Sequence, residues 1–254
     1  MNFKLRKIIK KIPKAMKNPR RSIALLLRYI SPKDSEIYRI GKWSYGKIPR
    51  LPITEVLPGI EKVDITLIRA YDRVIDTSLD IQEIMALSAI VRFTNSKNIL
   101  EIGTYNGNTA LNLAVNSVAD ALVTTVDLPP DWNGQFELKV HPSHLNVTEK
   151  AEVGSQYKNT KYSKKIMQIF SDSAKLDWSK LPIPFDIVFI DGCHSYEYVK
   201  KDTQNAMTYL KSGSILIWHD YGFVKDVSKV VDETAKKIKV RAIRGTRLAV
   251  GFIE

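Results

Sequence analysis

From residue 80 onward, short apolar runs alternate with longer segments in which apolar residues recur every three or four positions. The short runs predict buried strands, and the longer spacing predicts amphipathic helices. Their alternation predicts a parallel sheet with helices on both faces. The predicted strands are residues 98–102, 122–126, 166–170, 186–190, 214–218, 239–243 and 248–253. The predicted helices are residues 80–92, 108–118, 196–210 and 224–237.

The connection between the last two predicted strands, residues 244–247, is too short to hold a crossover helix. These strands should therefore form an antiparallel hairpin at the edge of the sheet. The pattern as a whole predicts an α/β protein with a Rossmann-like, doubly wound, seven-stranded sheet that ends in this hairpin. Residues 131–164 show no clear periodicity and are interpreted as a long polar insertion, a type of loop that is usually functional.

The first part of the chain has a different pattern. In residues 1–30, apolar positions recur at helical spacing among many lysines and arginines. Residues 31–58 are rich in proline, glycine and aromatic residues, which indicates an irregular connecting stretch. We therefore predict a basic N-terminal extension and linker over residues 1–60, followed by one α/β domain over residues 61–254.

The formal net charge of +12 is concentrated in the N-terminal segment. Residues 1–50 contain 15 of the 39 basic residues and two of the 27 acidic ones, which leaves 24 basic and 25 acidic residues in the rest of the chain. A nearly neutral body argues against a nucleic-acid partner for the domain. The basic, helically spaced residues 1–30 predict a helix on an anionic membrane surface, with a solvated tail as the alternative.

Cysteine usage and hydropathy suggest a location in the cell. The single Cys193 cannot form an internal disulfide, which is typical of a reducing compartment. The longest apolar run near the start, residues 23–27, is far shorter than the roughly 20 residues of a membrane-spanning helix. We expect a cytoplasmic protein, peripheral to the membrane if residues 1–30 bind it.

The first predicted strand leads into a glycine-containing loop, Glu101-Ile-Gly-Thr-Tyr-Asn-Gly107, that opens a helix. In open α/β sheets, ligands bind beyond the carboxyl ends of the strands. The loop lacks both the G-x-G-x-x-G fingerprint for dinucleotides and the Gly-Lys-Ser/Thr ending of a P-loop. Its spacing and leading acid suit a cofactor that has a cationic amino acid moiety and no phosphate, although an ordinary strand-to-helix turn would show the same glycines.

Two further strand ends carry acidic residues. Asp127 ends the second strand, where a carboxylate can accept hydrogen bonds from both ribose hydroxyls. Asp172 and Ser173 follow the third strand, where they would accept from the exocyclic amine of a purine. The alternative for each is a capping role in a turn or short helix. Their agreement with the glycine loop, each at the end of its strand, favours a shared binding site.

Residues 80–254 resemble the class I S-adenosylmethionine-dependent methyltransferases, through the glycine loop, Asp172-Ser173, Ile190-Asp-Gly-Cys-His-Ser-Tyr196 and Trp218-His-Asp-Tyr221. The resemblance is closest to the branch of small-molecule and sugar O-methyltransferases, related to the catechol type. It implies S-adenosylmethionine as the cofactor. The implied cofactor-binding residues are Glu101 and Gly103 near the methionine moiety, Tyr105 and Gly107 in the same loop, Asp127 on the ribose, Asp172 and Ser173 near the adenine, and Asp191.

Asp191 and Asp220 end neighbouring predicted strands, which lie about 5 Å apart. Both carboxylates would then reach one Mg²⁺ ion, which prefers oxygen ligands. The sequence departs here from the catechol-type pattern, which has Asn after the second acid, where this chain has Tyr221. The alternative for Asp191 is a structural carboxylate that holds the cofactor loop.

His194, three residues after Asp191, is the candidate general base, because the ordinary pKa of histidine lies near neutrality. His219 is a second candidate. We therefore predict O-methylation of a small-molecule or sugar hydroxyl, with His194 and Asp191 as the catalytic residues. The alternatives are a nucleic-acid methyltransferase that uses the basic N-terminal arm and a non-catalytic, membrane-associated module with this fold. The oligomeric state, a homo-oligomer included, stays open.

Overall fold

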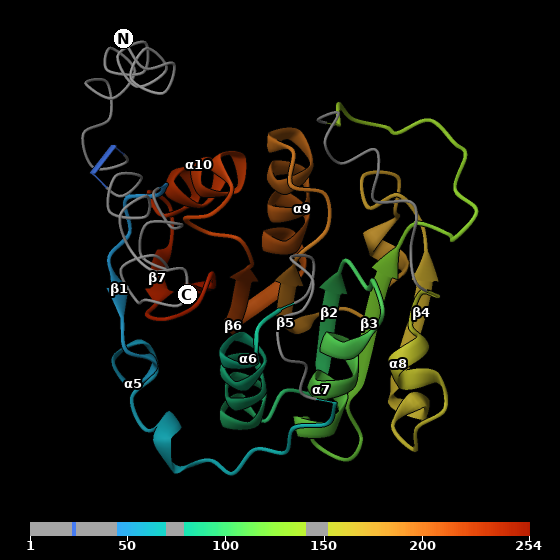
Figure 1. The fold of residues 1–254 in the computed structure, drawn as a ribbon, viewed down its shortest axis with the longest axis horizontal. Coiled ribbons are helices and arrows are strands. Elements are labelled where there is room, and N and C mark those ends of the chain that lie inside the picture. Colours follow the sequence, from blue (N-terminus) through green and yellow to red (C-terminus); the bar gives the residue numbers. More distant parts are fainter. Residues whose placement is uncertain (1–21, 24–44, 70–78, 141–151) are drawn as a thin grey trace, which may run out of the picture.

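The structure is a computed structural model that describes residues 22–23, 45–69, 79–140 and 152–254. Its centre is an eight-stranded sheet in the order β1-β7-β8-β6-β5-β2-β3-β4 (Figure 1). All pairs are parallel except those of β8, which runs antiparallel to β6 and β7. The strands are β1 Arg50–Leu51, β2 Asn98–Ile102, β3 Leu122–Asp127, β4 Ile166–Phe170, β5 Phe185–Ile190, β6 Leu210–Trp218, β7 Lys239–Ile243 and β8 Ala249–Phe252.

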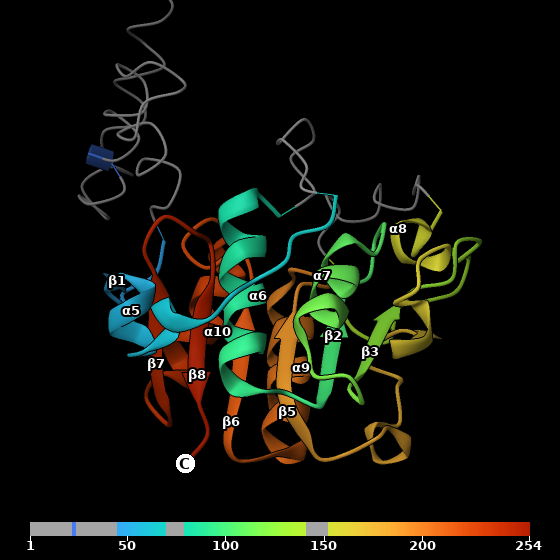
Figure 2. The same cartoon turned by 90° about the horizontal axis from the view of Figure 1, so that it is seen from below.

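Helices cover both faces of the sheet. The α-helices are α5 Ile53–Val56, α6 Ile81–Thr94, α7 Asn108–Asn116, α8 Ser155–Lys158, α9 Tyr196–Tyr209 and α10 Lys225–Thr234, and short 3-10 helices span Ile60–Lys62, Ser163–Lys165 and Trp178–Lys180. Helices α6 and α7 lie on one face, and α9 and α10 lie on the other (Figures 1 and 2). Each face thus has its own apolar core, as expected for a buried parallel sheet.

All seven predicted strands are present, and their ends differ from the prediction by at most a few residues. The predicted C-terminal hairpin is also confirmed, with β7 and β8 paired antiparallel. Strand β6 begins at Leu210, four residues earlier than predicted. The non-apolar residues Lys211 to Gly213 hid this first part of the strand, because the prediction followed the apolar run alone.

The eighth strand, β1, was not predicted. Residues 50–51 lie between Pro49 and Pro52 in the stretch interpreted as an irregular connection. A strand of two residues is too short to show an alternating pattern, so its pairing depends on its partner. β1 pairs parallel to β7 at the edge of the sheet, and Arg244 donates a backbone hydrogen bond to the carbonyl of Leu51 at 2.8 Å. The sheet therefore begins before residue 61.

Of two further predicted regions, one lies largely and the other partly outside the described residues. Apart from Ser22 and Ile23, residues 1–44, which contain the basic segment, are not described. Within the predicted insertion 131–164, residues 141–151 are also not described, and the described remainder includes α8. Within the described ranges, no helix is long and apolar enough to span a membrane.

Candidate active site

The carboxyl ends of strands β2 to β6 surround a cavity of about 430 Å³. This is the edge of an open parallel sheet at which ligands are expected to bind. Most of the predicted site residues line the cavity, namely Gly103, Tyr105, Asp127, Asp172, Ser173, Asp191, His194 and Asp220. Glu101 and Gly107 are not among the lining residues.

The two glycines of the loop are constrained by neighbouring protein atoms. Gly103 has a φ of 103°, and a Cβ atom there would lie 2.2 Å from the carbonyl oxygen of Asp191. Gly107 has a φ of 82°, and its Cβ would lie 2.6 Å from the ring of Tyr157. Close packing against Tyr157 of α8 therefore accounts for a glycine here, and contact of Gly107 with the cofactor stays a prediction.

Asp127 is fixed at the end of β3 by backbone donors. Its Oδ2 accepts from the N–H of Tyr105 at 2.7 Å, and its Oδ1 accepts from the N–H of Leu128 at 2.7 Å. Tyr105 has a left-handed φ of 48°, and its N–H points toward this carboxylate. Because a carboxylate oxygen has more than one acceptor site, these bonds orient Asp127 without excluding a ligand.

Asp172 and Ser173 at the end of β4 are also held by protein groups. Asp172 Oδ2 accepts from the hydroxyl of Tyr198 at 2.7 Å and from the N–H of Glu137 at 3.0 Å. Ser173 donates its hydroxyl to Asp202 Oδ2 at 3.2 Å. Burial is the largest influence on the pKa of Asp202 and raises it to about 7. Tyr198 and Asp202, both on α9, were not found from the sequence because a helix periodicity does not show which polar residues face a strand end.

Glu101 lies beneath the glycine loop. It pairs in register with Thr125 and Phe189, so its side chain shares their face of the sheet, which is covered by α7. Thr125 donates its hydroxyl to Glu101 Oε2 at 2.5 Å. Burial raises the pKa of Glu101 well above its usual value. The predicted contact of Glu101 with the cofactor stays a prediction. In this structure its side chain bonds to Thr125 and so links β2 to β3 near their carboxyl ends.

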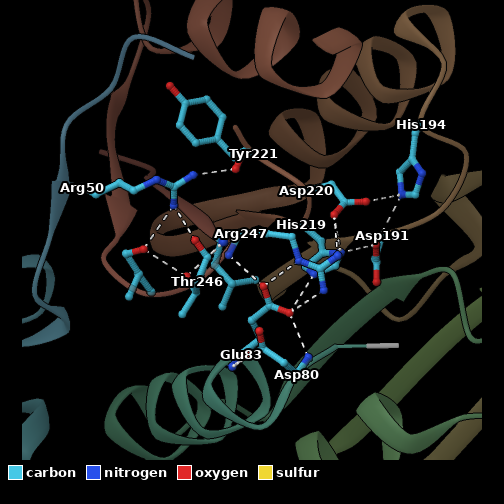
Figure 3. Close-up of polar contacts among 12 residues, drawn as sticks. Arg50, Asp80, Glu83, Asp191, His194, His219, Asp220, Tyr221, Thr246 and Arg247 are labelled. Carbon is cyan, nitrogen blue, oxygen red and sulfur yellow. Dashed lines mark hydrogen bonds and ion pairs between the residues drawn. The ribbon is translucent and has the colours of Figure 1, made fainter. Parts of the chain in front are cut away.

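Four predicted residues from the ends of β5 and β6 come together at the cavity (Figure 3). His219 Nδ1 lies 2.8 Å from Asp191 Oδ1. His194 Nε2 lies 3.2 Å from Asp220 Oδ2 and 3.5 Å from Asp191 Oδ1. The two candidate bases thus share the same two carboxylates, and His194 is the more exposed of the two, at 26% of its side chain against 4%.

Two charged residues that the sequence analysis missed complete this cluster. Arg247 donates its backbone N–H and its Nε to Glu83 Oε1 at 2.8 and 2.9 Å, and its Nη2 to Glu83 Oε2 at 2.8 Å. Its Nη1 donates to Asp220 Oδ1 at 2.9 Å. Glu83 Oε2 also lies 3.1 Å from His219 Nε2. Both Glu83 and Arg247 are almost fully buried.

Glu83 is in place because of the way α6 begins. Asp80 accepts from the N–H of Glu83, and Glu83 Oε2 accepts from the N–H of Asp80, each at 3.0 Å. This capping box has the sequence signature of an acid followed three residues later by Glu. The signature would have located the start of the helix, but not the long-range pairing of Glu83 with Arg247.

We call Glu83, Asp191, His194, His219, Asp220 and Arg247 the charged cluster. Burial lowers the pKa of His219, but the charges of the three carboxylates outweigh it and hold this pKa well above its usual value. His194 shows the same balance, with burial outweighed by Asp191 and Asp220, so that its pKa is raised. Burial raises the pKa of Asp191, but the two histidines bring it down to about 2. Mutual charge compensation therefore stabilises the cluster.

The predicted metal ligands can be tested against these contacts. Asp191, His219 and Asp220 each offer one donor atom within 4.8 Å of the others, so their spacing alone permits an ion. However, His219 Nδ1 is engaged by Asp191, and Asp220 Oδ1 by the guanidinium of Arg247. A nitrogen donor is also poorly suited to Mg²⁺, which prefers oxygen. The residues therefore do not fit the Mg²⁺ site predicted at Asp191 and Asp220.

Strand β1 braces the loops that carry this cluster. Arg50 donates to the carbonyl oxygens of Tyr221 at 2.7 Å and of Thr246 at 2.5 Å (Figure 3). Tyr221 follows Asp220 in sequence, and Thr246 precedes Arg247. The N-terminal edge strand, which was predicted as a linker, thus holds two parts of the site together.

Comparisons with known proteins agree with this geometry. Residues 100–221 match the family model described as a methyltransferase domain. A comparison with curated proteins finds no similar sequence. Among solved structures, the chain is similar to an SAH-bound methyltransferase from Podospora anserina, with 14% identity, a TM-score of 0.54, and coverage of 89% of this chain and 98% of that one.

Two further solved structures resemble this chain to about the same degree. An O-methyltransferase from Bacillus cereus in complex with SAH shows 15% identity and a TM-score of 0.50, with 79% of this chain and 90% of that chain covered. The O-methyltransferase of tomaymycin synthesis from Streptomyces achromogenes, in complex with SAM, shows 15% identity and a TM-score of 0.50, with 78% and 96% covered. The chain therefore has the fold of these methyltransferases, and its residues 100–221 match a methyltransferase-domain model.

Proposed function

We propose that the protein is an S-adenosylmethionine (SAM)-dependent O-methyltransferase that methylates a hydroxyl of a small molecule or sugar. One observation carries the proposal: a single cavity has the glycine loop with Asp127 and Asp172 at one side and His194 with its two carboxylates at the other. The similar O-methyltransferases that were solved with SAM or its demethylated product SAH support this assignment.

The cofactor is proposed to lie along the ends of β2 to β5. Gly103 and Tyr105 would contact its methionine end, and Asp127 its ribose hydroxyls. Asp172 and Ser173 would lie at the adenine. Asp191 borders the loop where the sulfonium would lie, and its low pKa keeps it anionic near that positive charge. The support for this orientation is the order of these residues around the cavity.

The proposed reaction is an in-line displacement at the cofactor's methyl carbon. Bound S-adenosylmethionine would supply the methyl group to the acceptor oxygen, and its sulfur would take back the electron pair of the broken carbon–sulfur bond. The ring of His194 would accept the acceptor's proton and pass it to solvent. Positioning alone contributes several kcal/mol to such reactions, and proton removal contributes about 10²-fold or more.

The charged cluster supports His194 as the base that receives this proton. Asp220 and Asp191 lie on the Nε2 side of its ring and would hold the imidazole in a fixed orientation. His219 is buried between Asp191 and Glu83, which favours a structural role for it. No step is assigned to a metal ion, because the contacts of Asp191 and Asp220 do not fit one.

Incubation with methyl-labelled SAM tests the function directly. We expect labelled product in pools of sugars or phenols and none in an RNA pool. Label in RNA alone would instead favour the nucleic-acid methyltransferase considered above. Binding of SAH without label in any pool would favour a non-catalytic cofactor-binding module.

We also propose that residues 1–30 attach the protein to an anionic membrane surface on the cytoplasmic side, ahead of a catalytic domain whose sheet begins with β1. The support is the basic charge and helical spacing of that segment, most of which lies outside the described residues. Deleting residues 1–30 should abolish sedimentation with phosphatidylserine vesicles and leave SAH affinity unchanged. Equal sedimentation of the full-length and truncated proteins would contradict this proposal.

A further inference from the structure

We infer that basic side chains of the protein take the place of a divalent ion beside Asp191 and Asp220, so that the site works without metal. Arg247 is the central residue in this arrangement and acts as a positioning residue for Asp220. The inference builds on the proposed function, since it concerns the same site, but its evidence is the geometry of the charged cluster alone.

The charges of the cluster are largely matched while His194 is neutral and fully matched once His194 has accepted its proton. It contains three carboxylates, those of Glu83, Asp191 and Asp220, and three basic side chains, those of Arg247, His219 and His194 (Figure 3). A divalent ion is held in proteins by an excess of negative ligands. Here each carboxylate has a basic group within 3.2 Å, so an added ion would meet a site without that excess.

The donor atoms of Asp220 and His219 are also committed. Asp220 Oδ1 accepts from Arg247 Nη1 at 2.9 Å, while Asp220 Oδ2 lies 3.2 Å from His194. The two ring nitrogens of His219 face carboxylates at 2.8 and 3.1 Å, an arrangement in which both nitrogens donate. A metal ligand must present a lone pair, so His219 would have to lose one of these donors before it bound an ion.

Arg247 is fixed strongly enough to perform this role. Three of its donors bind Glu83, which is itself held by the capping box of α6. The remaining Nη1 fixes Asp220, whose left-handed φ of 56° places its carboxylate between Arg247 and His194. A bidentate guanidinium is suited to such orientation, because its fork has a fixed geometry. Glu83 and Arg247 thus orient the carboxylate that orients the proposed base.

The test is titration of the metal-free, full-length protein with Mn²⁺, followed by electron paramagnetic resonance. The wild type should show no bound ion that depends on Asp191. Arg247→Ser should gain an Mn²⁺ site, because Asp220 and Glu83 lose their cation, and this site should disappear in Arg247→Ser/Asp191→Asn. Arg244→Ser is the matched control, since Arg244 is an exposed arginine of the same turn, and should behave like the wild type.

Binding of one Mn²⁺ by the wild type, abolished by Asp191→Asn, would overturn the inference. A folded Arg247→Ser protein that binds no Mn²⁺ would overturn the assignment of Arg247 as the residue that excludes the ion. If Arg247→Ser does not fold, as circular dichroism would show, the wild-type titration decides alone. SAH binding is measured separately by calorimetry, so a failure of the proposed cofactor site would be seen independently of the Mn²⁺ result.

Discussion

The two sides of the cavity are built by different means. At the ends of β3 and β4, uncharged donors hold the carboxylates of Asp127 and Asp172, mainly backbone N–H groups such as those of Tyr105 and Ala174, with the hydroxyl of Tyr198 added at Asp172. At the ends of β5 and β6, charged side chains hold the carboxylates, and Arg247 pairs with a residue 164 positions earlier in the chain. The cofactor side is therefore shaped by loop conformation, and the reactive side by long-range charge pairing.

This difference separates what substitutions should do. On the cofactor side, changes should act on the backbone path or on cofactor affinity. On the reactive side, changes should act on turnover and on the balance of charge, because a buried charge without its partner is strongly destabilising.

The largest expected effect is a loss of stability when a side chain is added to the backbone on the cofactor side. Gly103→Ala should lower the free energy of unfolding by about 4 kcal/mol or more, since its Cβ would lie 2.2 Å from the carbonyl oxygen of Asp191. Gly213→Ala is a matched control, because Gly213 also has a positive φ but has no atom within 4 Å of its Cβ. It should lose only about 1–2 kcal/mol. Urea denaturation measures both variants. Equal losses of unfolding free energy would contradict the close contact between the added Cβ and Asp191 as the cause of the larger loss.

The next effect concerns the reactive side. His194→Ala should lower turnover by roughly 10²-fold with whichever acceptor is labelled in the screen, because the proton acceptor is lost. The affinity for SAH, measured by calorimetry, should change little, since His194 belongs to the other side of the cavity. Unchanged turnover in His194→Ala would remove His194 as the base.

A smaller and opposite pattern is expected for Asp127. Asp127→Ala should weaken SAH binding by about 2 kcal/mol, roughly 30-fold, because hydrogen bonds to a carboxylate contribute on this scale. Asp127→Ala should therefore lose mainly SAH affinity, whereas His194→Ala should lose mainly turnover. SAH binding of wild-type strength in Asp127→Ala would contradict the proposed ribose contact.

The smallest effect is a pH dependence of stability on the cofactor side. Burial raises the pKa of Asp202 to about 7, so the folded state holds its proton while the unfolded state loses it near pH 4. The stability contributed by the proton is therefore lost as pH rises through about 7. Between pH 6 and 8 the free energy of unfolding should fall by about 1.4 kcal/mol from this residue.

Asp202→Asn should remove that part of the pH dependence, because an amide does not titrate. Asp131→Asn, a change at an exposed aspartate, is the control and should keep the wild-type slope. Thermal unfolding at pH 6, 7 and 8 measures the effect. Parallel pH profiles for wild type and Asp202→Asn would contradict the shifted pKa.

The features that the sequence predicted most accurately are those that depend on local pattern. The seven longer strands and the hairpin follow from apolar runs and from the short connection at residues 244–247. The placement of Asp127, Asp172 and Asp191 at strand ends follows from the topology of the sheet. These features need only the order of elements, which periodicity reveals.

The remainder depends on contacts between distant segments. Strand β1 is too short for a pattern, and it is held by β7 and by the contacts of Arg50. Glu83 and Arg247 have no local feature that predicts their pairing, so their effect on the predicted Mg²⁺ site could not be foreseen. The sequence also could not show that the ring of Tyr157 comes close to Gly107, because that contact joins segments about 50 residues apart.

Calorimetric titration of the purified full-length protein with SAH tests the central claim most directly. The account predicts binding of one equivalent, unchanged by a chelator and weakened in Asp127→Ala, because the strand ends around the 430 Å³ cavity form the cofactor site. The absence of measurable SAH binding to the folded wild-type protein would contradict it.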